Sequence, residues 1–473
     1  MTMRTKLLFL TLVALCSMAL NAQNPNIILK AAPDANKKLQ LSFRTISGTT
    51  PVSVDWGDGV PVSVGAVPAY GAGGSDATVT ELPKGTGDIK IYGDDIAMFY
   101  CSYVVAAGIK VSAVDVSNAP TLKDLNISSN DLSVIDLRSN INLELFTSDN
   151  NLFTNIDFTH NTALKNISMM SNRLTSIDLS KNTLLTKIHF GGSLTSANQL
   201  TEIDLKNNTE LTSIYLLFNK LTSIDLSKNT KLTYASLNNN NLKALDIKTL
   251  PVLKSVYCVQ NQITDLSVNT AVTKTLNFSR NKLVFKKMPP LVTGNTYTYA
   301  PQDTVIAIPT PTQVGSQVDL SDYNNIMNSS GVAQTTTYTW KKSDGTTLTK
   351  DVDYTLIDGK TTFLNIVDLN VYCEMSTPAY PLFTGANVVK TSLMAITPAT
   401  SVEENKLNNV KLIAAQGILK FQNLEAGYVV RIFTSTGIQT TSFTASGTEK
   451  ELRLSPGVYV VTINEKAQKI MMW

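Results

Sequence analysis

An aspartate recurs at a fixed interval through the middle of the chain, and this period constrains the fold more than any other feature of the 473-residue sequence. Five of the six intervals are 21 residues long, and the sixth is 26, one period plus a five-residue insertion. A column of asparagines runs in parallel, each followed two residues later by Leu or Ile. The aspartates are Asp115, Asp136, Asp157, Asp178, Asp204, Asp225 and Asp246, and the asparagines are Asn130, Asn150, Asn172, Asn219, Asn240, Asn261 and Asn281. The chain therefore contains a repeat array.

Within a repeat, the pattern of polar and apolar residues predicts one buried side and one exposed side. Aliphatic residues lie three and five positions before the Asn, as Leu216 and Ile214 do. A coil of this length cannot bury its own apolar side, so successive coils must stack into a solenoid with a shared core. The Asn amide then satisfies buried backbone groups that water cannot reach. Alternation in Ile224-Asp225-Leu226 places the aspartate outside.

The repeat text LTSIDLSKNTLLTKI and LTSIDLSKNTKLTYASL resembles the leucine-rich repeats of bacterial surface proteins with 21-residue units, the internalin-like adhesins among them. The resemblance covers roughly residues 112–283. It implies a mainly β solenoid that binds a partner, but it names no ligand, because the repeat specifies only the scaffold. Some relatives carry cysteine at the buried strand position of successive repeats, which Cys258 and Cys101 occupy only singly here.

The first residues predict export. Arg4 and Lys6 precede the apolar run Leu7 to Leu20, and Ala22 offers a small residue for cleavage, so residues 1–22 are typical of a secretory signal peptide. The run is too short for a comfortable membrane span. We expect no transmembrane segment elsewhere in the chain.

Residues 401–473 alternate and turn like a small β-sandwich. The text PGVYVV, the central Thr436-Gly437 turn and Lys469 resemble the C-terminal sorting domain of the type IX secretion system of Bacteroidetes. The chain departs from that pattern at Ser435, where many members have Asp, and in its Met-Met-Trp ending. The resemblance implies transport across the outer membrane by the type IX secretion machinery, followed by removal of the domain and surface anchoring. An ordinary last β domain that stays attached is the alternative.

Two further domains flank the array. Residues 24–88 contain Asp55-Trp56-Gly57-Asp58-Gly59, which resembles the turn of PKD-like β-sandwich domains, and we expect this β-rich segment to cap the array. We place the solenoid at 89–288 and an Ig-like β-sandwich at 289–400. Trp340 and Cys373 fall where Ig-like folds place a core Trp and a late-strand Cys.

Composition and rare residues exclude several functions. A net charge of +3 gives no footprint for nucleic acid. The three cysteines outside the signal segment are expected to be buried free thiols. The only two histidines, His160 and His189, form no catalytic or zinc-binding pattern, so we expect no enzyme activity, no metal and no cofactor.

The aspartate column allows several interpretations. Paired carboxylates can serve glycoside hydrolysis, but identical solvated groups have no environment that drives their pKa values apart. A solvated structural column, with lysines such as Lys181 and Lys228 offsetting the repulsion, is the favoured interpretation. Cation binding through carboxylate oxygens is the alternative.

The concave face of the sheet is the predicted binding site, because its outward positions vary while the inward ones are constrained. The outward positions lie four and two residues before each Asn or its equivalent. Apolar and aromatic groups there are not needed for the core and mark recognition of protein or carbohydrate, although they could instead be surface residues that pack on one another. The predicted site residues are Phe146, Met170, His189, Tyr215, Leu217, Tyr257 and Val259.

Together these features predict a secreted, monomeric protein at the outer-membrane or cell surface. It is expected to bind a host or bacterial surface protein or glycan, as an adhesin does. A structural envelope protein whose repeats only stiffen a stalk is the alternative, and an accessory glycan-processing enzyme is a third.

Overall fold

The structure is a computed structural model that describes residues 24–32, 34, 36–85, 87–102, 109–308, 312–365, 370–397, 405–407, 409–415 and 417–472. The predicted signal peptide therefore lies outside the described residues. The chain divides into two compact units, Met1–Asp303 and Thr304–Trp473. Each unit is described by itself.

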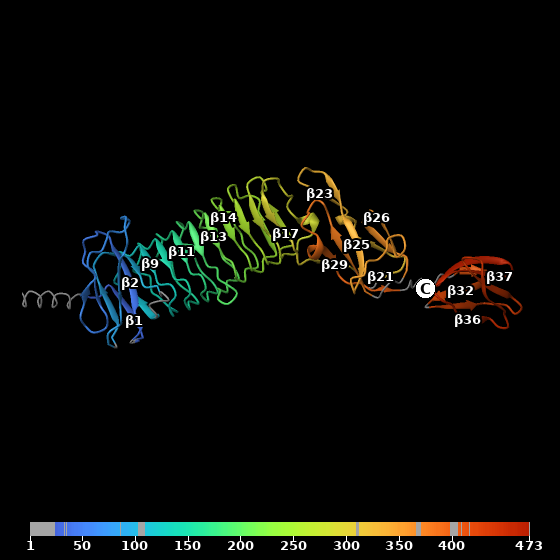
Figure 1. Cartoon of the computed structure of the whole chain (residues 1–473), viewed down its shortest axis with the longest axis horizontal. Helices are drawn as coiled ribbons and strands as arrows, with labels where there is room; N and C mark the ends of the chain where they lie inside the picture. The colour runs from blue at the N-terminus through green and yellow to red at the C-terminus, as the bar shows by residue number, and fades with distance from the viewer. Residues whose placement is uncertain are drawn as a thin grey trace, which may run out of the picture. The chain divides into compact units, whose positions relative to one another are not determined.

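A leucine-rich-repeat solenoid dominates the first unit, as the repeat text predicts. Its sheet has twelve strands, and those from β7 to β19 run parallel, one per coil. Figure 1 shows β9, β11, β13 and β14 following one another along the array. In spatial order the strands are β5 (Ala77–Glu81), β2 (Leu39–Thr45), β7 (Ile96–Tyr100), β9 (Asp124–Asn126), β10 (Leu145–Thr147), β11 (Asn166–Ser168), β12 (Lys187–His189), β13 (Ser213–Tyr215), β14 (Tyr234–Ser236), β16 (Ser255–Tyr257), β18 (Thr275–Asn277) and β19 (Thr296–Thr298).

Each short strand points its middle residue into the core and the residues on either side of it outward. In β13, Ile214 is buried, whereas Ser213 and Tyr215 are half-buried on the outward side. The predicted inward residues are confirmed as buried: Leu125, Ile127, Ile167, Met169, Ile214, Leu216, Val256, Cys258, Leu276 and Phe278. The core is thus continuous along the array, as stacking requires.

The asparagine column is confirmed as structural, and its hydrogen bonds join each coil to the preceding one. Asn219 donates from Nδ2 to the carbonyls of Phe190 (2.9 Å) and Leu216 (3.1 Å). Its Oδ1 accepts the N–H of Leu200 at 3.0 Å. The buried members of the column are Asn130, Asn151, Asn172, Asn198, Asn219, Asn240, Asn261 and Asn281, and Gln302 takes the position in the last coil.

One asparagine assignment needs correction. In the second repeat the buried residue is Asn151, not Asn150, which instead takes the left-handed conformation at φ 54°. The equivalent position holds Ser129, Ser171 and Asn239, also at positive φ. Asn tolerates that backbone well, so two adjacent asparagines serve two different purposes. The correction shifts the register of this repeat by one residue.

The five-residue insertion displaces another member of the asparagine column, which the 21-residue period does not predict. Asn198 lies 26 residues after Asn172 and donates to the carbonyls of Met169 and Phe190 at 2.8 and 3.0 Å. The additional residues therefore fall between β12 and Asn198. Leu200 follows two residues later, so the Asn-x-Leu signal was present in the sequence.

A second buried asparagine column supports the return side of the coils. Asn229 donates from Nδ2 to the carbonyls of Leu205 and Asn208, both at 2.9 Å. The column comprises Asn140, Asn161, Asn182, Asn208 and Asn229. Each amide links its own coil to the preceding one, which explains why Asn recurs at this position.

The aspartate column lies outside, as predicted, and it also closes a turn in every repeat. Asp225 Oδ1 accepts the backbone N–H of Ser227 at 2.8 Å. The equivalent bond recurs at Asp115, Asp136, Asp157, Asp178, Asp204 and Asp246. A short acidic side chain that bonds the backbone two residues on is the usual chemistry of such a turn.

The N-terminal segment packs as β structure against the first coil. Five strands form one sheet, in the order β4 (Val62–Ser63), β3 (Ser53–Asp55), β6 (Ile89–Tyr92), β1 (Ile27–Ala31) and β8 (Val111–Asp115). Strands β2 and β5 extend the solenoid sheet beyond β7, so they cover its end. The predicted turn is confirmed: Gly57 and Gly59 have positive φ, and both donate N–H bonds to Asp55 Oδ1 at 2.9 Å.

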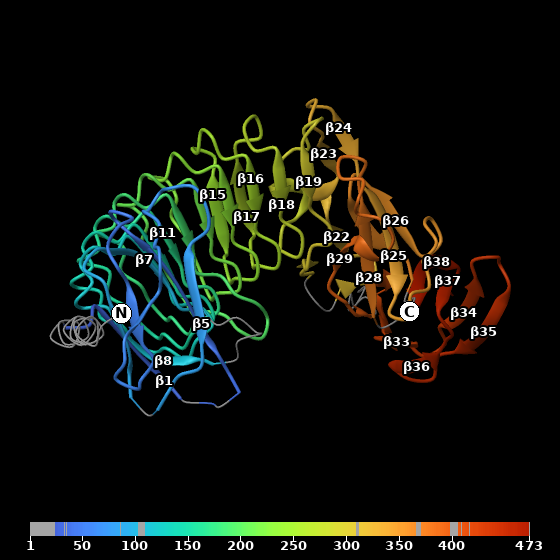
Figure 2. The same ribbon diagram turned by 60° about the vertical axis from the view of Figure 1, so that its left-hand side comes forward.

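The solenoid continues past the predicted end at residue 288. Strand β19 adds a coil, Tyr299 is buried, and the first unit ends at Asp303. The asparagine period could not reveal this coil because Gln302 replaces Asn. On the return side, β15 (Ala244–Ile247) pairs with β17 (Asp265–Val268), visible in Figure 2, and the 3-10 helix η1 (Phe285–Lys287) follows.

The second unit begins with two sheets whose side chains share a core. One sheet has the order β20 (Val305–Ile306), β29 (Val389–Thr391), β28 (Val371–Ser376) and β25 (Thr337–Lys342), and the other β22 (Gln317–Asp319), β27 (Lys360–Phe363) and β26 (Tyr354–Ile357). Trp340 of β25 lies opposite Cys373 of β28 and contacts the ring of Phe363 in β27. Smaller elements are β21 (Thr312–Gln313), β30 (Ile396–Thr397), β23 (Asn325–Met327), β24 (Ala333–Thr335), η2 (Ser321–Tyr323) and η3 (Gly385–Asn387).

The C-terminal segment forms two four-stranded sheets. One has the order β31 (Asn405–Leu407), β32 (Val410–Ala415), β33 (Ile418–Gln422) and β36 (Glu449–Arg453), and the other β35 (Gln439–Thr444), β34 (Val429–Thr434), β37 (Gly457–Ile463) and β38 (Lys466–Met472). Leu419, Phe421, Ile432 and Val461 belong to one buried cluster contributed by both sheets. The segment is therefore a small β-sandwich, as the alternation predicts.

Candidate binding surface on the parallel sheet

Four rings stack on the outward face of the solenoid sheet, one on each of four successive strands. They belong to His189, Tyr215, Tyr234 and Tyr257, and we call them the aromatic row. The ring centres lie 5.1 Å apart for His189 and Tyr215, 4.9 Å for Tyr215 and Tyr234, and 5.7 Å for Tyr234 and Tyr257. The angles between neighbouring rings are 44°, 31° and 40°. Stacks with such spacing are favourable beyond the area that they bury.

The row is assembled from two different positions of the repeat. Tyr215 and Tyr257 lie in register with Ser236 between them, whereas Tyr234 occupies the first residue of β14. Ser236 is buried, and its small side chain leaves space that the Tyr234 ring occupies. Sequence reasoning missed Tyr234 because only the positions four and two before each Asn were considered, although alternation also turns the residue six before it outward.

A cation and an aliphatic group border the row. Lys187 Nζ lies 5.2 Å from the centre of the Tyr215 ring, a cation–π distance. Leu217 lies over Gly191 of the preceding coil, where an added Cβ would lie 2.5 Å from Leu217 Cδ2. Gly191 therefore provides the space that Leu217 fills.

The predicted site residues divide into three groups. The structure brings His189, Tyr215, Leu217 and Tyr257 together on the outward face. Met170 and Val259 are half-buried on the same face, and their N–H groups donate to Asp149 and Asn238 at 2.7 and 2.8 Å. The expectation for Phe146 is wrong. Its side chain is only 1% exposed and packs on Phe158 in the core, because the repeat is counted from Asn151.

Burial changes the protonation of the row. Loss of solvation lowers the pKa of His189 below its ordinary value of 6.5, against an opposing effect of Asp149 and with a further lowering by Lys187. His189 is therefore neutral at pH 7. Burial also raises the pKa of Tyr234, and Tyr215 and Tyr257 raise it further. At neutral pH neither His189 nor Tyr234 therefore carries a charge.

The remaining titratable groups serve the fold. Burial raises the pKa of Asp124, whose Oδ2 accepts a 2.7 Å hydrogen bond from the Tyr100 hydroxyl. In the aspartate column, the hydrogen bond from the Arg138 side chain lowers the pKa of Asp136 to about 2. Burial raises the pKa of both Cys101 and Cys258 to about 12, and these thiols are free and buried, as is Cys373. No cluster of three His, Cys, Asp or Glu suited to a metal ion occurs among the described residues.

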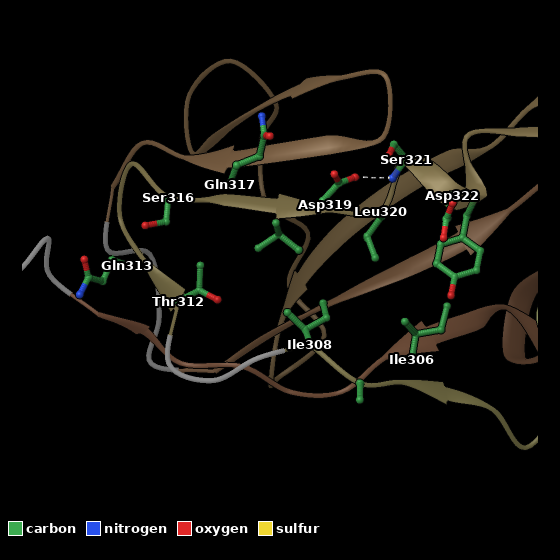
Figure 3. A pocket seen from close by; sticks show the side chains of 13 residues that line it. Ile306, Ile308, Thr312, Gln313, Ser316, Gln317, Asp319, Leu320, Ser321 and Asp322 are labelled. Carbon is green, nitrogen blue, oxygen red and sulfur yellow. Dashed lines mark hydrogen bonds between the residues drawn. The ribbon is translucent and has the colours of Figure 1, made fainter.

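An open groove in the second unit holds no comparable constellation. It is lined by residues between Ile306 and Tyr323 (Figure 3). Asp319 is engaged there, since its Oδ1 accepts the N–H of Ser321 at 2.9 Å and its Oδ2 pairs with Lys360 at 3.3 Å. Within the described ranges, none of the helices has the length and apolar character needed to cross a membrane.

The chain is similar to solved structures of leucine-rich-repeat proteins. No protein-family profile and no curated protein sequence matches the chain. The functional domain of InlJ from Listeria monocytogenes, which includes a cysteine ladder, is 18% identical over 61% of this chain and 79% of that chain, with a TM-score of 0.31. An internalin (InlF) from the same species is 20% identical over 44% and 68%, with a TM-score of 0.34. YopM, a leucine-rich effector protein from Yersinia pestis, is 22% identical over 42% and 52%, with a TM-score of 0.33.

Proposed function

We propose that the chain is a noncovalent binding protein that recognises a partner through the outward face of its solenoid sheet, at the aromatic row. The partner is a protein or glycan of a host or bacterial surface, so adhesion is the role that we favour. The aromatic row carries this proposal. Four rings lie together at outward positions where the fold requires no apolar side chain.

Most other coils support this interpretation because they have no aromatic group at the same place. The exception is Tyr100 of β7, whose hydroxyl donates to Asp124 Oδ2 at 2.7 Å within the fold. The positions equivalent to Tyr215 hold Asn126, Thr147, Ser168 and Asn277, all in well-formed strands. Stacking across strands stabilises a sheet by about 0.2–1 kcal/mol per pair. The coils with small polar residues at this position form without that contribution. Aromatic side chains concentrated on four adjacent strands are therefore better explained by recognition than by stability.

We further propose that the protein is exported and held at the cell surface. The signal segment at 1–22 and the C-terminal resemblance to type IX sorting domains motivate this proposal. Residues 24–88 would then cap the solenoid, and the sheets of residues 289–400 would act as an Ig-like spacer. The origin in Bacteroidetes belongs to the same proposal.

A ligand screen with a footprint tests the binding proposal. The full chain is screened against a panel of host glycoproteins and glycans, and hydrogen exchange is measured with and without the ligand found. We expect protection of backbone amides in 187–191, 213–217, 234–238 and 255–259. Protection confined to the second unit, or to the return side of the coils, would show that the solenoid is a spacer.

A further inference from the structure

We propose that the aromatic row binds an extended polypeptide segment that carries an acidic side chain next to aliphatic ones, and not a sugar ring. This inference rests on the proposed function of the same face. It follows from how the rings pack, from the lysine beside them and from an exposed leucine near Gly191.

The stacking distances show that the rings do not lie flat side by side. Two rings lying flat side by side could not bring their centres closer than about 6.3 Å, because each ring carbon lies about 1.4 Å from its centre and nonbonded carbons approach to about 3.5 Å. The observed separations of 4.9–5.7 Å are shorter. The rings are therefore tilted against one another, by 31–44°, along the array.

Closely packed, tilted rings are a poor platform for a sugar. Tyr215 lies between His189 and Tyr234, and Tyr234 lies between Tyr215 and Tyr257, so each inner ring has a neighbouring ring on both sides. A pyranose ring that stacks on an aromatic side chain needs an open ring face. Only the outer faces of the two end rings remain, and they lie three coils apart.

The exposed ring edges suit a peptide backbone. The hydroxyls of Tyr215 and Tyr257 make no hydrogen bond within the described part of the chain, so both can donate to carbonyl oxygens of a ligand. Three steps of about 5 Å make the row roughly 15 Å long, which corresponds to four or five residues of extended chain. The row is therefore long enough to hold a short linear segment.

The charge beside the row selects an acidic group. Lys187 is exposed and is the single charged residue among the outward strand positions of β12, β13, β14, β16 and β18, since His189 is neutral. It pairs with no carboxylate among the residues that the structure describes. A carboxylate of the ligand can therefore reach it without displacing an internal partner.

The insertion supplies an aliphatic edge. Residues 193–197 turn back through a bond from the Ser193 N–H to the Ser196 carbonyl at 2.7 Å, and Leu194 is 86% exposed in that turn. Three residues of chain span at most about 11 Å, so Leu194 stays near Gly191, on which Leu217 lies. Leu194 and Leu217 together offer an apolar contact on the side of the row away from Lys187.

A peptide library and a glycan array, both applied to the full chain, test this inference. Random peptides of about twelve residues displayed on phage are selected on the immobilised protein, and synthetic copies of the enriched sequences are titrated. We expect an Asp or Glu beside Leu, Ile, Val or an aromatic residue. Leu194→Ser should weaken the peptide at least about tenfold and Lys187→Gln about fivefold, the latter effect disappearing at high salt.

Matched variants distinguish a failure of this inference from a failure of the proposed binding function. Val134 is also exposed, at 73%, but lies in the coil of β9, three strands from β12, so Val134→Ser should change the affinity less than about twofold. Glycans bound in place of peptides, and lost in Tyr215→Ser/Tyr257→Ser, would overturn the peptide inference and leave the binding face intact. Peptides indifferent to that double variant would overturn both. Failure of the peptide library to yield a binder would also contradict the inference, whereas the glycan array is expected to yield none.

Discussion

The rings of Tyr215 and Tyr234 stack with their centres 4.9 Å apart although the two residues occupy different positions of the repeat. In register, Tyr215 lies opposite Ser236 of the next strand, and Tyr234 lies opposite Ser213. The contact forms because Ser236 is small and buried, which leaves its place on the surface to the neighbouring ring. The aromatic row is thus a property of several adjacent coils, and no single position of the repeat encodes it.

Asn219→Ala should destabilise the array more than Asp225→Ala. Removing the amide leaves the Leu200 N–H and two carbonyls without their partner, at about 1–3 kcal/mol for a buried group left unpaired. Asp225 is exposed and loses one turn bond to Ser227, so a change below about 1 kcal/mol is expected. Urea unfolding of the full chain measures both, and equal losses would show that the aspartate turns carry the fold as much as the buried column does.

Gly191→Ala should destabilise the solenoid through Leu217. The added Cβ would meet Leu217 Cδ2 at 2.5 Å and Cγ at 3.0 Å, and overpacking of this kind costs about 1–3 kcal/mol. Gly191 does not need a positive φ, so the backbone itself accepts alanine. In the double variant Gly191→Ala/Leu217→Ala the clash is gone, and a double-mutant cycle in urea should give a coupling of at least about 1 kcal/mol. Additive losses would mean that the two residues do not share this space.

The repeat pattern predicts the residues that are common to the coils. It does not predict the positions at which one coil departs from the others. Period and alternation alone assign the inward residues, because every coil must bury the same face. The Phe146 error arose because Asn150 and Asn151 both fit the column by type, and only the backbone decides which one takes the left-handed position. The last coil was missed because Gln302 can reach the same carbonyl groups as Asn by a longer side chain. Tyr234 joins the site through ring packing, which a one-dimensional pattern does not contain.

Stability should depend on the pH through His189. Burial lowers the pKa of His189 in the folded protein below the ordinary 6.5, so the unfolded chain binds more protons in this range. The contribution to the free energy of unfolding is therefore complete above about pH 6.5 and is lost as the pH falls through the folded pKa. Melting temperatures between pH 8 and 5 should fall more steeply for the wild type than for His189→Gln. Parallel curves would mean that the imidazole is not desolvated.

The C-terminal domain should be absent from the form recovered at the cell surface. The prediction follows from the resemblance of residues 401–473 to sorting domains, together with the N-terminal signal. The intact mass of the surface protein decides it, with removal of the signal segment as an internal control. A mature protein that still ends at Trp473 would contradict the sorting assignment.

The most direct test of the account is the affinity of the Tyr215→Ser/Tyr257→Ser variant for the partner found by screening. Both residues belong to the aromatic row. Lys228→Ser, which changes an exposed side chain on the convex side, serves as the control. Because the inward core residues are unchanged, the variant should fold, losing only the stacking contribution of about 0.5–1.5 kcal/mol per ring pair. We expect binding to weaken by about 1–2 kcal/mol or more per tyrosine, the usual scale of an interface anchor, with little change in the control. A folded double variant that binds as tightly as the wild type would contradict the assignment of the aromatic row as the binding site.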